Sequence, residues 1–409
     1  MTNYQSNTNA RVAYGLQGAL GAKAATGGAA NVLRVAGGAG AKLTKASTVS
    51  NEIRKDGLSM RGRHGTQKTS GDYAAELSLG SHDPILEAIM RGNWSAAPFE
   101  LDAADFTSIT TTAHSIVFKT GNPITLGLRN GNVIRLAGAA TAANNGRNLR
   151  ITGLSPTTVT VAETLTVDAV DDVGATIARP GKILTNPATR IPRYFTLEEY
   201  EGDIDQSTLV PDFVWGSAKL SMTANGIINI DPGGIGTGRF EALPIAESPY
   251  FEDPVETIDA PMSVVDATIR FRGEDLVELT SFDLTMDIQL SAPDTFGSGA
   301  IKYAPDVFAG SLQVSANITM LRKSLDVLSD FIDETQLQLH ILAVDNMSEP
   351  KDFMSIVVPN FTLGGVDPSN FSKQGGGRTQ TIQIPPALVG IDTSATGNNS
   401  MIEFQTTAA

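Results

Sequence analysis

The segment Phe282-Asp283-Leu284-Thr285-Met286-Asp287-Ile288-Gln289-Leu290 alternates apolar and polar side chains without a break. Strict alternation over this length is typical of a β-strand with one buried face and one polar face. Residues 312–320 repeat the pattern, and residues 337–341 give a third, shorter strand. We therefore expect a mainly β protein in which these strands present one apolar face to the core.

Between the second and third of these strands the apolar spacing becomes that of a helix. One face of a helix over residues 324–334 would carry the apolar side chains Leu325, Leu328, Phe331 and Ile332. Ser324 is placed to cap its start. We expect this helix to flank the sheet and pack on it.

Composition limits the function classes. The chain has 409 residues, which is long for one core and favours two domains. It contains 30 Lys and Arg residues and 44 Asp and Glu residues, which gives a net charge of -14. This charge disfavours tight binding to nucleic acid or to an anionic membrane surface. It has no cysteine, so a disulfide framework is excluded. No apolar run is long enough for a membrane anchor, and no signal peptide is evident, so we expect folding in the cytoplasm of the cell that makes it.

The sequence offers no recognisable site for chemistry. Its four histidines are scattered without metal-ligand spacing, and the glycines of residues 37–42 lack the Gly-Lys-Ser/Thr of a phosphate-binding loop. His340 falls on the polar side of its strand, where we expect it to be solvated. Carboxylates are abundant enough for a glycosidase pair, but aromatic residues, which commonly line sugar clefts, make up only 6%. We expect no catalytic residue, no metal and no cofactor.

Two glycine-rich stretches lack any hydrophobic period. Residues 1–45 are rich in Gly and Ala and are interpreted as an N-terminal arm that is mobile or loop-forming. Val32, Leu33 and Val35 could form a short strand inside it, and the arm would be ordered only where it touches another subunit. The glycines at positions 233, 234, 236 and 238 are interpreted as a flexible surface loop.

A second set of motifs precedes residue 100. Residues 71–79 alternate as a strand, and Asp83-Pro84 opens a short helix that ends before Gly92. The run Ser50-Asn51-Glu52-Ile53-Arg54, this strand and the segment from Asp83 to Trp94 together resemble the amino-terminal pattern of tail tube proteins of long-tailed bacteriophages. Around Phe213 and Gly216, a phenylalanine, a glycine and an alternating strand are similar to the same family. The resemblance covers roughly residues 45–108 and 195–390.

The resemblance implies a fold, an assembly and partners. The fold would be a tail-tube-type β-sandwich or barrel with a flanking α-helix. Six copies would form a ring, and rings would stack into a tube in the virion, assembled in the bacterial host cytoplasm. The partners would be the chain itself, a tape measure protein, tail-end proteins and viral DNA that passes through without sequence-specific binding. The family also favours a non-contractile, siphovirus tail.

Residues 109–190 depart from the family pattern. Short alternating runs and turn signals such as Asn130-Gly131 predict a small all-β domain, inserted between residues 46–108 and 191–409 of the tube domain. We expect this module to project from the tube wall. The alternative, that these strands extend the main sandwich, stays open.

Two sets of residues are candidates for function. The polar residues of the strongest strands would line the lumen: Asp283, Thr285, Asp287, Gln289, Gln313, Ser315, Asn317 and Thr319. A lumen of carboxylates and small polar groups would repel phosphate, so DNA would slide. Residues near the first tail-tube motif would contact a neighbouring subunit: Asn51, Glu52, Arg54 and Asp56.

Other functions remain compatible with the pattern. A self-associating β-rich virion or surface component, such as a capsid decoration protein or a fimbrial subunit, would show similar alternating strands. A carbohydrate-binding or carbohydrate-cleaving β-protein is a further alternative. Hollow rods or rings in negative-stain microscopy would separate a tube protein from both.

Overall fold

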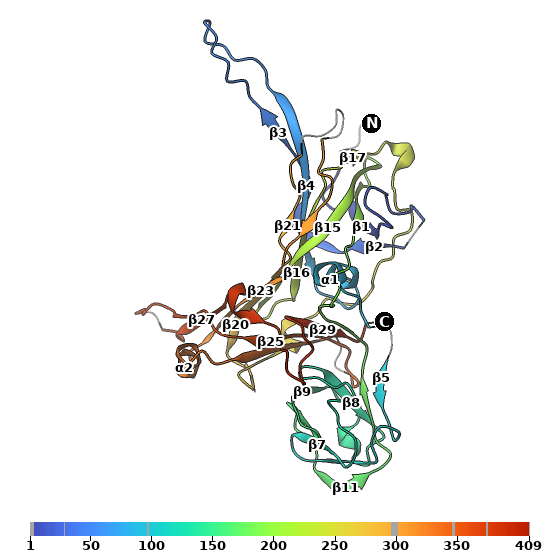
Figure 1. Ribbon diagram of the computed structural model, residues 1–409, viewed down its shortest axis with the longest axis vertical. Coiled ribbons are helices and arrows are strands. Elements are labelled where there is room, and N and C mark those ends of the chain that lie inside the picture. The colour runs from blue at the N-terminus through green and yellow to red at the C-terminus, as the bar shows by residue number, and fades with distance from the viewer. Residues whose placement is uncertain are drawn as a thin grey trace.

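The computed structural model describes residues 4–27, 29–95, 98–295, 302–345, 348–373 and 375–408. These residues form an elongated β-rich molecule with a long hairpin at one end and a separate small sheet at the other (Figure 1). The expectation of a mainly β fold is confirmed.

The largest sheet has twelve strands. They are β1 (Ala10–Leu16), β2 (Ala30–Leu33), β3 (Val35–Thr48), β4 (Arg63–Glu76), β14 (Phe195–Glu201), β15 (Gln206–Thr223), β16 (Asn229–Gly236), β17 (Glu241–Ala242), β20 (Leu279–Asp287), β23 (Gln313–Leu321), β26 (Gly365–Pro368) and β27 (Thr379–Ile384). All pairings are antiparallel. The long strand β15 organises them, because its first half pairs with β14 and β17 and its second half with β16 and β20.

A seven-stranded sheet and one helix complete the main core. The sheet contains β13 (Lys182–Leu184), β18 (Thr268–Phe271), β19 (Glu274–Asp275), β24 (Leu337–Val344), β25 (Phe353–Phe361), β28 (Val389–Gly390) and β29 (Glu403–Thr406). Helix α1 (Asp83–Met90) buries Ile85, Leu86, Ile89 and Met90. Apolar side chains of α1 and of both sheets form one contiguous cluster, so these elements fold as layers around a single core.

An aromatic group marks the centre of that core. Trp215 of β15 is fully buried, and its ring meets Tyr14, Tyr73 and Phe213 edge-on, at centroid distances of 5.8, 5.9 and 4.9 Å. Edge-to-face packing is a favoured geometry for aromatic pairs. It links β15 to β1 and β4, which lie far from it in sequence.

The third sheet has eight strands and its own core. They are β5 (Phe99–Leu101), β6 (Ile109–Thr111), β7 (Ser115–Phe118), β8 (Val133–Ala137), β9 (Leu149–Leu154), β10 (Thr158–Val161), β11 (Asp168–Asp172) and β12 (Thr176–Arg179). Its buried apolar side chains, from Leu101 to Ile177, form a cluster separate from the main one. The sheet thus begins before residue 109, and β13 already pairs with β29 in the seven-stranded sheet. The division of the chain into an arm, a tube domain in two parts and an inserted domain stays a prediction.

Smaller elements connect the sheets. Strands β21 (Leu290–Ser291) and β22 (Phe308–Ala309) pair with each other. Short 3₁₀ turns occupy η1 (Ala142–Asn144), η2 (Ile245–Glu247), η3 (Val264–Asp266) and η4 (Pro386–Leu388).

The interpretation of residues 1–45 as a mobile arm is wrong for the described residues of this stretch. Strand β1 lies between β2 and β14 inside the largest sheet, and β3 pairs with β4 along its whole length. Several glycines of this stretch lie at β-bulges of strand β3. Gly38 has φ +122°, and a Cβ there would lie 2.7 Å from the Asp72 carbonyl oxygen. The sequence pattern did not indicate strand β3, because its small residues do not alternate between apolar and polar side chains.

The prediction of a flexible loop at four glycines is wrong for Gly233, Gly234 and Gly236, whereas Gly238 lies in a bend after the strand. Gly233, Gly234 and Gly236 belong to β16, which is paired on both sides by β15 and β4. A Cβ on Gly234 would lie 2.2 Å from the Val214 carbonyl oxygen. Glycine is required here for close backbone approach rather than for flexibility.

The second helix is shorter and less buried than expected. Helix α2 (Asp326–Ile332) has Leu325 at its N-cap position, and the Ser324 hydroxyl accepts a hydrogen bond from the Asp326 amide at 3.3 Å. Val327 is its buried residue, whereas Leu325 and Ile332 are exposed. The helix flanks β26 and contacts the main core through Val327 and, of the predicted face, through the partly buried Phe331.

Candidate assembly surfaces

The predicted lumen residues lie together on one face of the largest sheet. Strands β20 and β23 pair so that Asp283 lies opposite Asn317, Thr285 opposite Ser315, and Asp287 opposite Gln313. Thr319 pairs with Ser281 in the same row, and the intervening Phe282, Leu284 and Met286 are buried on the other face. Gln289 differs, because it follows the end of β20 with φ +51° and is exposed.

This polar face continues across seven neighbouring strands. Ser217, Lys219 and Ser221 of β15 lie opposite Asp287, Thr285 and Asp283. On the other side, Asn317 and Thr319 lie opposite Gln383 and Thr381 of β27. The residue pairing between neighbouring strands shows that the face starts at β4, crosses β16, β15, β20, β23 and β27, and ends at β26. Side chains here are small and polar, as expected for a broad surface in contact with water.

The charge on the face is mostly negative. Its carboxylates are Asp72, Glu76, Asp231, Asp283, Asp287 and Asp367. Among the described residues of these seven strands, the cations on this side are Lys219 and, where β4 pairs with β3, Lys68. Lys68 forms an ion pair with Asp294. Lys219 lies opposite Thr285. Its Nζ lies 3.1 Å from Asp283 Oδ1, and both side chains are too exposed for the pair to add much stability.

Asp231 shows the effect of crowded carboxylates. Burial raises the pKa of Asp231, and the nearby Asp283 carboxylate raises it further, while Lys219 acts in the opposite direction. The face is therefore an acidic surface in which Lys219 and Lys68 offset only part of the negative charge.

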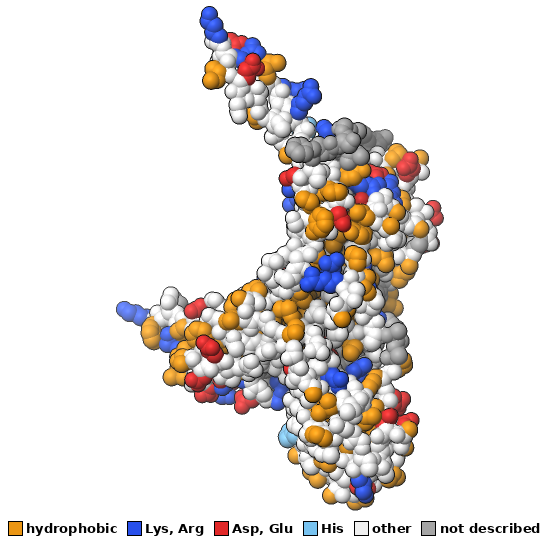
Figure 2. Space-filling view, viewed as in Figure 1, with side chains coloured by type: hydrophobic (Ala, Val, Ile, Leu, Met, Phe, Trp, Pro, Cys, Tyr) orange, Lys and Arg blue, Asp and Glu red, His pale blue; other side chains and the backbone are white. Residues whose placement is uncertain are grey.

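The predicted interface residues lie at the tip of a projecting hairpin. Asn51, Glu52, Arg54 and Asp56 all fall in the loop of residues 49–62 between β3 and β4. The hairpin extends away from the body of the molecule (Figure 1), and charged and apolar side chains gather at its tip (Figure 2). Exposed apolar side chains on the loop are Val49, Ile53, Leu58 and Met60. The tip thus exposes apolar surface that a partner could bury.

Two of the tip charges are paired with each other. Arg54 Nη2 donates to Asp56 Oδ2 at 2.6 Å, and this hydrogen bond holds the pKa of the Asp56 carboxyl below its usual range. The Leu58 amide also donates to Asp56. These contacts shape the tip into a turn. Sequence patterns could not give this geometry, because the loop has no regular period.

The hairpin base is fixed by a carboxylate. Glu199 Oε1 of β14 accepts a hydrogen bond from the Tyr73 hydroxyl at 2.7 Å and another from the Ala41 amide at 2.7 Å. Burial raises the pKa of Tyr73, and Glu199 raises it further. Glu199 thereby joins β3 and β4 to the main sheet. No sequence motif signals this role.

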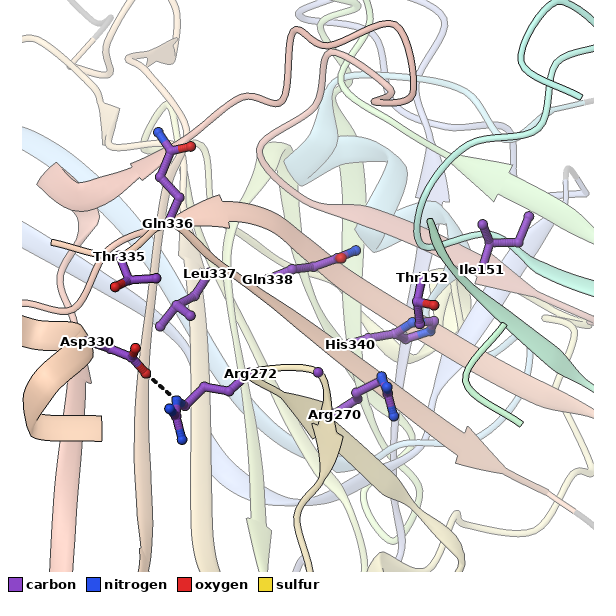
Figure 3. A pocket seen from close by; sticks show the side chains of 11 residues that line it. Ile151, Thr152, Arg270, Arg272, Asp330, Thr335, Gln336, Leu337, Gln338 and His340 are labelled. Atoms are coloured by element: carbon purple, nitrogen blue, oxygen red, sulfur yellow. Dashed lines mark hydrogen bonds and ion pairs between the residues drawn. The ribbon is translucent and has the colours of Figure 1, made fainter. Parts of the chain in front are cut away.

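A cavity of about 330 Å³ lies between β9, β18 and β24 (Figure 3). Arg272 and Asp330 form an ion pair at its edge. His340, expected in solvent, is instead buried, and burial lowers its pKa to about 3, so the ring is neutral at ordinary pH. Its Nε2 lies 2.8 Å from the Ser355 hydroxyl. Ser355 is only 1% exposed, so its hydroxyl cannot reach a substrate as a nucleophile. The pair of His340 and Ser355 is therefore part of the packed interior.

The described residues contain neither a metal-binding cluster nor a membrane-spanning helix. No group of three or more His, Cys, Asp or Glu there is arranged to hold a metal ion. Among the same residues, no helix combines the length and the apolar character that crossing a membrane demands.

The surfaces together define a class of protein. The sheet has a long polar face and edge strands that are paired on one side only, and the hairpin exposes apolar side chains. This combination is typical of a structural subunit that associates with further copies. A family model described as phage tail tube protein matches residues 7–385, which is most of the chain. The chain therefore belongs to the phage tail tube family and is a structural component of a virion. The comparison with curated proteins gave no match.

Proposed function

We propose that six copies form a ring and that rings stack into a tube that conducts the viral genome during ejection. The acidic polar face, with Asp283, Thr285, Asp287, Gln313, Ser315, Asn317 and Thr319, would line the lumen, with Gln289 at its margin. The observation that carries this proposal is the continuous polar face across seven strands, in a protein of the tail tube family.

Edge strands supply the means of ring closure. Strand β26 pairs only with β27, and β3 pairs only with β4, among the described strands. Each presents a row of backbone groups to solvent, which is the arrangement that invites pairing with another chain. Pairing between neighbouring copies would satisfy these groups and join the sheets into one barrel.

The charge of the face suits a conduit. DNA carries closely spaced phosphates, and a carboxylate wall repels them rather than binding them. Six copies of the face would multiply the negative charge around the axis. DNA would then pass without sequence-specific binding, after a tape measure protein has left the lumen.

The hairpin would make the contact between rings. Asn51, Glu52, Arg54 and Asp56 lie at the end of the longest projection of the molecule (Figure 1). A projecting segment with exposed apolar side chains can bury them only against another molecule. Tail-end proteins would meet the same surfaces where the tube ends.

The eight-stranded sheet would project from the outer wall. Its core is separate from the main core, and it occupies the opposite end of the molecule from the hairpin (Figure 1). We assign residues 109–190 chiefly to this module, which is dispensable for tube formation. The tube belongs to a siphovirus-type tail and is assembled in the host cytoplasm.

Negative-stain microscopy of the purified protein tests the proposal. Hollow rods, or rings with sixfold symmetry, are expected at high protein concentration. A single closed particle that stays monomeric at every concentration would contradict it. Removing residues 50–61 should leave rings but no rods, whereas loss of rings as well would place the hairpin within the ring.

A further inference from the structure

A second cavity, of about 220 Å³, opens beside the end of helix α1. Its apolar lining includes Ile89 and Met90 of α1, Leu312, and Ile391, which is 46% exposed. The cavity therefore has a hydrophobic floor that reaches the surface, and an apolar side chain would gain by entering it.

Two arginines give the cavity a positive rim. Arg91 caps α1 in the left-handed conformation with φ +53°, and Arg190 lies on the same rim. Both arginines line this one cavity, and the pKa of Arg91 is lowered by burial and by the charge of Arg190. Arg190 Nη1 donates to the Gly310 carbonyl at 3.1 Å.

No carboxylate neutralises this rim directly. Within the described ranges, the Arg91 side chain makes no hydrogen bond and no ion pair, and Arg190 forms no ion pair. Asp306 acts on Arg91 electrostatically, but its Oδ1 already accepts hydrogen bonds from the Tyr194 hydroxyl at 2.8 Å and from the Val307 amide. The cavity thus fits an apolar side chain that stands beside a carboxylate.

The hairpin tip carries such a pair. Ile53 is 99% exposed, and Glu52 precedes it. Arg54 and Asp56 are paired with each other, so they are not available to Glu52. In the described part of the chain Glu52 forms no ion pair. Its negative charge complements the two rim arginines.

The tip reaches another copy rather than its own cavity. The hairpin projects away from the body that contains α1 (Figure 1). Beyond the last strand pair, Thr48 with Arg63, the shorter arm of the loop reaches Ile53 in five residues and extends at most ~17 Å at the ~3.3 Å rise of a strand. The loop adds to the reach of β3 and β4 and carries the tip further from its own α1 (Figure 1).

We propose that Ile53 of one copy enters the cavity beside α1 of a second copy, with the Glu52 carboxylate paired to Arg91 and Arg190. The inference rests on the proposed function and names the receiving surface for the hairpin. A new interface formed this way combines a buried apolar anchor with a charge pair that fixes its register.

Disulfide trapping tests the contact, because the chain contains no cysteine of its own. A double variant, Ile53→Cys with Ile391→Cys, is assembled and oxidised, then separated under non-reducing conditions. A ladder of covalent oligomers is expected, since each copy would link to the next through one tip and one cavity. The matched control, Ile53→Cys with Val170→Cys in the eight-stranded sheet, should give no ladder.

Two failures are distinguishable in this experiment. Rods that form normally but give no ladder from the 53–391 pair would overturn the cavity assignment and leave the tube function intact. Wild-type protein that forms neither rods nor rings would refute the tube function itself.

Charge exchange gives an independent test. Glu52→Arg and Arg91→Glu should each raise the protein concentration needed for rods by about tenfold or more, as loss of a buried interfacial pair does. The combined variant should recover part of this loss. Glu100→Arg, the same kind of charge reversal at an exposed position of β5 in the eight-stranded sheet, should leave rod formation unchanged. Single variants that polymerise like the wild type would overturn the proposal.

Discussion

Replacing Glu403 with glutamine should remove a specific part of the pH dependence of stability. Glu403 of β29 is buried where the seven-stranded sheet meets the eight-stranded sheet. Its Oε1 accepts a hydrogen bond from Asn132 Nδ2 at 2.7 Å, and Asn398 donates to its other oxygen. Burial raises the pKa of this carboxyl to about 7, while Asn398, Arg179, Asn132 and Arg129 act in the opposite direction.

The sign and size of the effect follow from the two pKa values. In the unfolded chain the carboxyl loses its proton near pH 4.5, whereas in the folded protein it keeps the proton until about pH 7. The folded state therefore binds more protons between these values, and the free energy of unfolding falls as pH rises through this window. A difference of about 2.5 pKa units at ~1.4 kcal/mol per unit gives about 3 kcal/mol.

The assay compares urea unfolding of the wild type and Glu403→Gln at pH 5 and pH 8. The stability of the wild type relative to the variant should fall by up to about 3 kcal/mol between these values. Burial lowers the pKa of His82 to about 4 and of His340 to about 3. These histidines make stability rise with pH, but they are present in both proteins and cancel in the comparison. Equal pH dependence in the two proteins would refute the reasoning.

Three further predictions concern the sheet, the hairpin and the polar face. Gly234→Ala should lower the Tm by several degrees, because the new Cβ would meet the Val214 carbonyl oxygen at 2.2 Å, and an unchanged Tm would mean that the strands separate freely. Replacing residues 50–61 by Asn-Gly should preserve the Tm and abolish rods in negative stain, because only the exposed tip is lost. Asp283→Lys with Asp287→Lys should make assembled rods retain DNA in a low-salt sedimentation assay, and retention that is lost at high salt would identify the interaction as electrostatic. Rods that exclude DNA despite both lysines would argue that this face lies outside the lumen.

The strands with strict alternation could be predicted from the sequence. Residues 282–290 and 312–320 became β20 and β23, because period-two patterns fix which side chains face the core. Seven of the eight predicted lumen residues consequently share one face. Gln289 lies beyond the strand because the chain turns there with positive φ. The pattern could not show that β4, β16 and β27 extend the same face, since that depends on pairings between distant segments.

Glycine-rich strands and buried polar groups could not be predicted. Strands β3 and β16 have no apolar alternation, and their glycines permit bulges and close packing that become evident only from neighbouring backbone atoms. His340 was expected in solvent because it alternates with Leu339 and Ile341. Its strand is covered on both faces, with the eight-stranded sheet on one side, so the polar side is buried as well.

The central claim is that the polar face of β20 and β23 surrounds the axis of a tube. A cryo-electron microscopy map of assembled rods, at a resolution that shows side chains, tests it most directly. The account predicts that Asp283, Asp287 and Asn317 point toward the axis in every copy, with β26 and β3 edges joined between copies. A map that places these side chains on the outer wall, or against a neighbouring ring, would contradict it.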